Sequence, residues 1–199
     1  MIDTLHRLDQ DLTLAINSLH FTGGDYFWQL MSWKESWYPL YALVLVMLIR
    51  RLGWKKALIV LASLILTVVA CDQMANLVKD NVARLRPCYD SRMLAGGLYV
   101  LERRASYYGF FSGHAANAFG FAMCSVMGFR NDRTTRYRGY SWFIYIWASL
   151  IGISRIFAGK HYLGDVLVGT LMGLLIGFVM GWLARRAIKA LECESSCQA

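Results

Sequence analysis

The sequence predicts an all-α membrane protein, a polytopic bundle of about five transmembrane helices preceded by an N-terminal interfacial helix. Hydrophobic residues make up 57% of the 199 residues, whereas about 45–50% is usual for a soluble domain. Five uncharged runs concentrate these residues, and the longer ones approach the roughly 20 residues that cross ~30 Å of hydrocarbon. The runs are 37–49, 57–71, 110–129, 140–154 and 166–184. We therefore expect residues 1–199 to form a single integral-membrane domain.

The first 35 residues predict helices that lie along the membrane surface. Residues 1–20 place four charged side chains between leucines and isoleucines at helical spacing: Asp3, Arg7, Asp9 and Asp11. This pattern is typical of an amphipathic interfacial helix and unlike a signal peptide. Residues 25–37 predict a second, shorter interfacial helix.

Basic residues in short loops predict how the bundle is oriented. The segments after the first, third and fifth runs are rich in arginine and lysine, and five helices crossing in series put all three on one side. The positive-inside rule makes that side cytoplasmic. The polar tail, residues 190–199, is then cytosolic, and the roles of its Cys193 and Cys197 stay open.

The first of three polar clusters is "KDNVARLRP", residues 79–87. Lys79 and Arg86 are seven residues apart and would share one face if the helix beginning near Trp54 continued to Pro87. Asp72 lies another seven residues upstream, within the apolar run. It is either a packed polar residue bonded to a neighbouring helix or part of a catalytic site, and we favour the former.

The second cluster, "FSGHAANAFG", opens the third apolar helix with Ser112, Gly113 and His114. The unpaired N–H groups at a helix N-terminus favour an anion, and glycine lets the backbone approach it closely. An ordinary N-cap by Ser112 is the alternative.

The third cluster, "SRIFAGKHYLGD", joins the fourth and fifth apolar helices. Arg155 ends one helix, and His161 and Asp165 open the next at a spacing of four, which predicts one shared helical face. A carboxylate one turn away can hold an imidazole in a single tautomer. An interfacial ion pair with Arg155 and Lys160 reaching toward water is the alternative.

In a serial five-helix bundle all three clusters emerge on the outward side. The outward loop, residues 79–109, adds further basic residues, including Arg84, Arg92, Arg103 and Arg104. The positive-inside rule does not explain positive charge on this side. An anion-binding role for this loop could explain it.

The residue types in this layer suit phosphoryl transfer. Three cations, Lys79, Arg86 and Arg155, together with the N-terminus at Gly113, would hold a multiply charged oxyanion. His161, oriented by Asp165, is the better nucleophile and would form a phosphohistidine, while His114 serves as acid and base. Three adjacent cations would repel a metal ion, so we expect neither a metal nor another cofactor.

These residues resemble the signature motifs of the type 2 phosphatidic acid phosphatases, the superfamily that includes vanadium haloperoxidases. The matching positions are Lys79, Arg86, Pro87, Ser112, Gly113, His114, Ser154, Arg155, His161 and Asp165. The resemblance implies phosphate binding by Lys79, Arg86, Ser112, Gly113 and Arg155, and catalysis by His161, His114 and Asp165 without a metal. It departs at Phe111, where the family has proline. The motif spacing leaves Lys160 outside the mechanism.

A site at the outer boundary of a membrane bundle is reached by a phosphate headgroup whose tails stay in lipid. We therefore expect a lipid phosphate substrate, a surrounding of membrane lipid and no nucleic acid partner. The resemblance to bacterial members favours an inner-membrane enzyme with an outward, periplasmic site acting on lipid A phosphates or undecaprenyl diphosphate. Phosphatidylglycerophosphate or phosphatidate hydrolysis, lipid-to-lipid phosphotransfer, a non-catalytic binder and a haloperoxidase-like activity are the alternatives.

One further pattern concerns helix packing. Gly169, Gly173, Gly177 and Gly181 continue the spacing of four along the last helix, which predicts a small-residue stripe that lets a neighbouring helix approach closely. We expect the stripe to pack within the bundle rather than form a dimer interface. The oligomeric state stays open.

Overall fold

The computed structural model describes residues 2–101 and 106–197. The predicted charges at Arg103 and Arg104 lie outside the described residues. Within the described residues the chain is helical, and β pairing is limited to one antiparallel bridge between Leu85 and Tyr108. The predicted all-α fold class is therefore confirmed.

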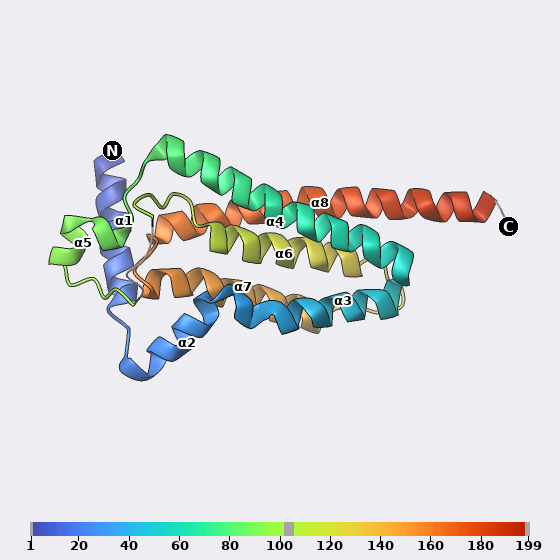
Figure 1. The fold of residues 1–199 in the computed structure, drawn as a ribbon, viewed down its shortest axis with the longest axis horizontal. Helices are drawn as coiled ribbons and strands as arrows, with labels where there is room; N and C mark the ends of the chain where they lie inside the picture. Colours follow the sequence, from blue (N-terminus) through green and yellow to red (C-terminus); the bar gives the residue numbers. More distant parts are fainter. Residues whose placement is uncertain (1, 102–105, 198–199) are drawn as a thin grey trace.

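Five helices lie side by side and run alternately up and down (Figure 1). They are α3 (Tyr38–Leu52), α4 (Trp54–Val82), α6 (Gly113–Phe129), α7 (Arg138–Phe157) and α8 (Leu163–Cys197). Three of them, α4, α7 and α8, are long and apolar enough to cross a membrane. Helices α3 and α6 have only 15 and 17 residues, so the count of five spans stays a prediction.

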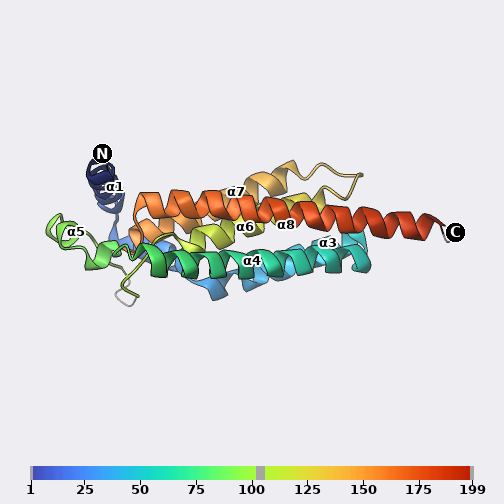
Figure 2. The ribbon, with the colours of Figure 1, turned by 90° about the horizontal axis from the view of Figure 1, so that it is seen from above.

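The N-terminal segment forms α1 (Ile2–Asn17), α2 (Thr22–Ser32) and the short 3-10 helix η1 (Lys34–Trp37). Helix α1 lies across the end of the bundle and is seen almost end-on in Figure 2. Its exposed face carries leucines, including Leu5 and Leu8, and its other face buries Gln10, Thr13 and Asn17. This arrangement agrees with a helix that lies along a membrane surface. The second helix begins three residues earlier than predicted and ends at Ser32; an extended Trp33 separates it from η1.

Helix α4 ends sooner than the sequence predicts. It stops at Val82, and Ala83 adopts a left-handed conformation at its C-cap. Arg86 is then extended, with φ −73° and ψ 155°, as expected for a residue that precedes proline. The expectation that Lys79 and Arg86 share a helical face is therefore wrong. Arg86 instead lies in an extended segment, where its backbone N–H donates to the carbonyl of Tyr107.

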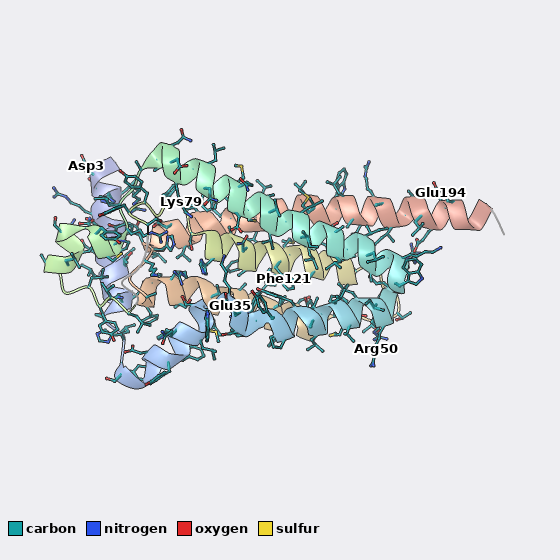
Figure 3. The ribbon with its side chains drawn as sticks, viewed as in Figure 1. Asp3, Glu35, Arg50, Lys79, Phe121 and Glu194 are labelled. Atoms are coloured by element: carbon teal, nitrogen blue, oxygen red, sulfur yellow. The ribbon has the colours of Figure 1, made fainter. Side chains whose placement is uncertain are left out.

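The segment between α4 and α6 folds back over the end of the bundle. It contains the 3-10 turn η2 (Pro87–Tyr89) and the short helix α5 (Ser91–Ala95). Figure 1 shows α5 beside α1, at the end where α4 and α7 finish and α6 and α8 begin. Figure 3 places Lys79 toward this end and Arg50 and Glu194 toward the other. The three polar clusters therefore share one layer, as predicted.

The glycine stripe on α8 packs against α6. A Cβ atom at Gly173 would overlap the backbone of Ala116, and one at Gly177 would overlap the backbone of Gly120. The stripe is therefore a packing surface inside the bundle, as predicted. Cys71 and Cys124 are buried among apolar residues and pack there as small hydrophobes.

Candidate active site

His161 lies in the loop between α7 and α8, at the centre of the polar layer. Its side chain is 3% exposed, and its Nε2 atom lies 3.0 Å from Nη1 of Arg86. An arginine only donates hydrogen bonds, so this contact requires a lone pair on Nε2. The ring proton of the neutral imidazole then lies on Nδ1, which is 3.5 Å from Oδ2 of Asp165.

Asp165 connects the second and third clusters. Its carboxylate is fully buried, and its Oδ2 atom accepts from the backbone N–H of Tyr162 at 3.1 Å. Its backbone carbonyl accepts from the N–H of Ser112 at 3.0 Å. Because α8 begins at Leu163, His161 precedes the helix, and the expectation that His161 and Asp165 share a helical face is wrong. They meet because Asp165 reaches back across the first turn.

Arg86 is 7% exposed and is held by the backbone on two sides. Its Nε atom donates to the carbonyls of Ser106 and Tyr108 at 2.8 and 3.1 Å, and its Nη1 atom donates to the carbonyl of Lys160 at 3.1 Å. This packing leaves no room beside Gly109, where a Cβ atom would lie 2.8 Å from Cγ of Arg86. The guanidinium is therefore fixed against the imidazole.

Ser112, Gly113 and Lys79 complete the predicted set. The Ser112 hydroxyl is buried and accepts from the N–H of Ala115 at 3.4 Å, so it caps α6. Gly113 is the first residue of α6. Lys79 lies in the last turn of α4, near enough to Arg86 for the two charges to interact.

His114 faces two cavities. One, of about 630 Å³, is also lined by Arg155, Lys160 and residues of α2 and its C-terminal flank, among them Gln29 and Trp33. Arg155, at the end of α7, is 4% exposed and donates to the Ser32 hydroxyl. Lys160 is 8% exposed, so neither cation reaches out along the lipid surface. The alternative of an exposed interfacial ion pair does not fit this burial.

The second cavity, of about 410 Å³, is a mostly apolar groove between α3, α4 and α6. Lys34, Asp72 and His114 line it together with apolar residues that extend to Leu48. Asp72 accepts from the Asn117 amide at 2.8 Å, so it bonds to a neighbouring helix as we favoured.

Burial lowers the pKa of His161 from its usual 6.5 to about 4. Desolvation is the largest cause; Asp165 acts in the opposite direction, whereas Arg86 and Arg155 add to the lowering. The imidazole therefore stays neutral at ordinary pH. A neutral ring with its lone pair on Nε2 is the form that can attack an electrophile.

Sequence reasoning missed the contributions of three residues to this layer, namely Arg84, Asp9 and Lys34. Arg84 donates to Asp165 at 2.6 Å and to Asp9 of α1 at 2.7 Å. Lys34 lines the groove beside His114. The basic character of the outward loop was the signal for Arg84, but nothing in the sequence pairs it with an aspartate 75 positions away.

Comparison with known proteins gives the chain a family. A model of the PAP2 superfamily matches residues 56–189. A lipid A 4'-phosphatase of Bacteroides thetaiotaomicron is 34% identical over 197 residues, which cover 98% of this chain and 85% of that protein. A lipid A 4'-phosphatase of Porphyromonas gingivalis is 30% identical over 172 residues, covering 86% and 70%.

Two solved structures share the fold. Aquifex aeolicus LpxE superposes with a TM-score of 0.62 at 23% identity, over 85% of this chain and 92% of that one. A transmembrane PAP2-type phosphatidylglycerolphosphate phosphatase of Bacillus subtilis gives a TM-score of 0.70 at 19% identity, over 92% and 87%. Taken with the match over residues 56–189, these findings establish that the chain belongs to the PAP2 superfamily.

Proposed function

We propose that this protein, a hydrolase of the PAP2 type, removes phosphate from a membrane lipid through a phosphohistidine on His161. The observation that carries the proposal is the contact of 3.0 Å between Nε2 of His161 and Arg86. It fixes the tautomer with the lone pair on Nε2 and sets a cation beside it. A bound phosphate oxygen would replace Nε2 as the acceptor for Nη1 of Arg86, which would free the lone pair for attack.

The proposed first step is attack by Nε2 of His161 on phosphorus. The new N–P bond forms while the bond from phosphorus to the lipid oxygen breaks. His114 donates a proton to that oxygen, and the dephosphorylated lipid leaves. The Nδ1 proton of His161 stays on the ring and faces Asp165, which stabilises the positive charge that the attack creates.

The second step is hydrolysis of the phosphohistidine. Water attacks phosphorus, His114 takes a proton from the water, and the N–P bond breaks to return its electron pair to Nε2. Arg86, Arg155, Lys79 and the N-terminus of α6 at Ser112 and Gly113 would bind the phosphate oxygens throughout. Inorganic phosphate is then released, and the imidazole is neutral again.

The two cavities support an amphiphilic substrate. His114 lines both, so a leaving oxygen at their junction would connect a headgroup in the polar cavity with tails in the apolar groove. Lys160 lines the polar cavity although the motif spacing left it out, and we include it as a further cation for the headgroup.

Among lipid phosphates, we favour a phosphate monoester on lipid A. Two relatives at 34% and 30% identity are named lipid A 4'-phosphatase. Tyr26 and Trp33 line the polar cavity and are largely exposed, and Gln29 lies there too. Aromatic faces and an amide suit a sugar ring better than a glycerol headgroup.

We further propose that the active site faces the periplasm from the bacterial inner membrane, with the C-terminus in the cytoplasm. The support is a group of exposed arginines at the opposite end of the bundle, in the loop between α6 and α7 and at the first residue of α7: Arg130, Arg133, Arg136 and Arg138. Short loops rich in arginine stay on the cytoplasmic side.

The test measures phosphate release by the purified wild type and His161→Ala. The panel contains lipid A, undecaprenyl diphosphate and phosphatidylglycerophosphate at equal surface concentration. We expect the wild type to release phosphate fastest from lipid A and His161→Ala to release none. A wild type that binds these lipids tightly but releases no phosphate would indicate a binder and contradict the proposal. Phosphate recovered on an added acceptor lipid would indicate phosphotransfer instead of hydrolysis.

A further inference from the structure

We infer that Arg84 and Asp9 position the pair formed by His161 and Asp165, so that the N-terminal helix α1 helps to aim the nucleophile. The inference rests on the proposed function and extends it, because Asp9 lies far from every signature motif. Nη1 of Arg84 donates to Asp165 and Nη2 donates to Asp9, so the end of the guanidinium faces these two carboxylates. We therefore assign Arg84 and Asp9 as positioning residues that act through Asp165.

The two oxygens of Asp165 have different partners. Oδ1 accepts from Nη1 of Arg84 at 2.6 Å, whereas Oδ2 accepts from the N–H of Tyr162 and lies 3.5 Å from Nδ1 of His161. A fully buried carboxylate needs such partners to offset the loss of hydration. Because Arg84 occupies Oδ1, the carboxylate is rotated so that Oδ2 faces the imidazole. Arg84 and the N–H of Tyr162 together thus fix the direction in which the carboxylate faces the imidazole.

Arg84 is itself held on several sides. Its Nη2 atom donates to Oδ2 of Asp9 at 2.7 Å and lies 3.1 Å from Nδ1 of His6. Its guanidinium lies 4.0 Å from the centre of the Tyr162 ring. The planar fork of arginine lets one side chain serve two carboxylates in fixed directions. Arg84 therefore links α1 directly to the carboxylate of Asp165.

Asp9 also caps the helix that carries Asp165. The N–H groups in the first turn of a helix have no partner within it. In α8, the N–H of Gly164 donates to Oδ1 of Asp9 at 2.8 Å, and the N–H of Leu163 donates to the Thr13 hydroxyl at 2.9 Å. Asp9 thus fixes both Arg84 and the start of α8. Moving α1 would displace Asp165 through both connections.

Arg92 provides a matched control, because its Nη1 and Nη2 atoms both face α1 and the anion-binding role suggested for the outward loop therefore does not extend to it. It also reaches α1, donating from Nη2 to Asp11 at 2.9 Å and from Nη1 to Gln10 at 2.7 Å. The side chains of Arg92 and Asp11 are exposed, at 44% and 61%, and no bond joins either to Asp165. Removing this pair therefore loosens α1 without releasing the carboxylate.

The experiment uses full-length Arg84→Gln, Arg84→Lys and Asp9→Asn, with Arg92→Gln and Asp11→Asn as controls. We measure kcat and KM for phosphate release from the lipid that the wild type hydrolyses fastest, and the thermal midpoint in the same detergent. A displacement of about 1 Å in a reacting group can cost about 10²-fold in rate. We expect Arg84→Gln to lower kcat about 10²-fold while KM changes less than about threefold.

Asp9→Asn should lower kcat about tenfold, since it weakens one connection of Arg84 and keeps the other. Arg84→Lys should recover part of the loss, because an ammonium can still reach Oδ1 of Asp165. The controls Arg92→Gln and Asp11→Asn should stay within about twofold of the wild-type kcat.

A kcat for Arg84→Gln no lower than that for Arg92→Gln would overturn the inference, and so would an effect confined to KM. If Arg84→Gln does not fold, a wild-type kcat in Asp9→Asn overturns it instead. An inactive wild type would remove the proposed function and this inference together. An active wild type with an unaffected Arg84→Gln would remove only this inference.

Discussion

The two ends of the helix bundle are both rich in basic residues, but only one end buries them. At the end covered by α1, Arg86, Arg155 and Lys160 are 7%, 4% and 8% exposed. At the other end, the arginines between α6 and α7, such as Arg133 and Arg136, are exposed. The number of charges is therefore a poor guide to a site. Burial with fixed partners is the better one.

The difference has a physical cause. A buried cation loses its hydration and is retained only where carbonyls, carboxylates or a ligand replace it. Arg86 has such replacements in the carbonyls of Ser106, Tyr108 and Lys160. Exposed arginines keep their water; the Arg51 side chain, for example, is 45% exposed although it lies 3.7 Å from Asp132. Substitutions at the two ends should therefore differ sharply in their effect on activity.

The largest difference should come from His161→Ala set against Arg133→Ala. Removing the proposed nucleophile should lower kcat by more than about 10³-fold, because no other side chain can take its place in the covalent step. Arg133→Ala should stay within about twofold of the wild type. Both variants are assayed for phosphate release and for acid-quenched labelling of the protein with phosphate. A labelled phosphoenzyme in His161→Ala would show that the intermediate forms elsewhere.

The next largest difference should separate Arg86→Lys from Arg136→Lys. Lysine keeps the charge at Arg86 but cannot reproduce donors that reach Ser106, Tyr108 and Lys160 at once. We expect kcat/KM to fall about 10²-fold for Arg86→Lys and to change little for Arg136→Lys. Equal, small effects of the two substitutions would mean that charge alone matters at the buried end.

A smaller effect should follow from Lys160→Met, compared with Arg130→Met. Methionine keeps most of the length of the side chain and removes its charge. Because Lys160 lines the headgroup cavity, we expect kcat/KM to fall about tenfold, mostly through KM. Arg130→Met should leave both constants unchanged. An unchanged KM in Lys160→Met would contradict the proposed role of Lys160 in binding the headgroup.

The sequence predicted the residues that lie within its motifs better than the contacts between distant segments. The spacing from Arg155 to Asp165 identified His161. These residues meet because only a short loop separates the end of α7 from the start of α8. The sequence also predicted that the end of α4 would lie in the same layer. It could not predict Arg84 with Asp9, since that contact depends on how α1 lies across a bundle that forms far along the chain.

Local backbone detail explains the remaining differences. The predicted helix through Arg86 ended at Val82, because Ala83 turns left-handed and proline at position 87 favours an extended Arg86. The predicted exclusion of Lys160 rested on motif spacing, which carries no information about burial. Its side chain is nonetheless 8% exposed and faces the same cavity as His114. Side-chain direction in a loop is decided by tertiary packing, which a single sequence does not display.

The smallest expected change concerns pH. Burial lowers the pKa of His161 to about 4, so the imidazole should stay neutral when the pH falls from 7 to 5.5. An imidazole with the ordinary value of about 6.5 would be mostly protonated at pH 5.5. The chain has 4 histidines, and the ¹⁵N signal of His161 is the one that disappears in His161→Asn.

The sign of the linked effect on stability follows from the same value. Between about pH 4 and 6.5 the unfolded chain binds a proton at His161 that the folded chain does not. Unfolding therefore becomes easier as the pH falls through this window, and His161→Asn should weaken that dependence. A ¹⁵N signal that titrates near 6.5 would mean that water reaches the imidazole, and the buried end of the bundle would then resemble the solvated end.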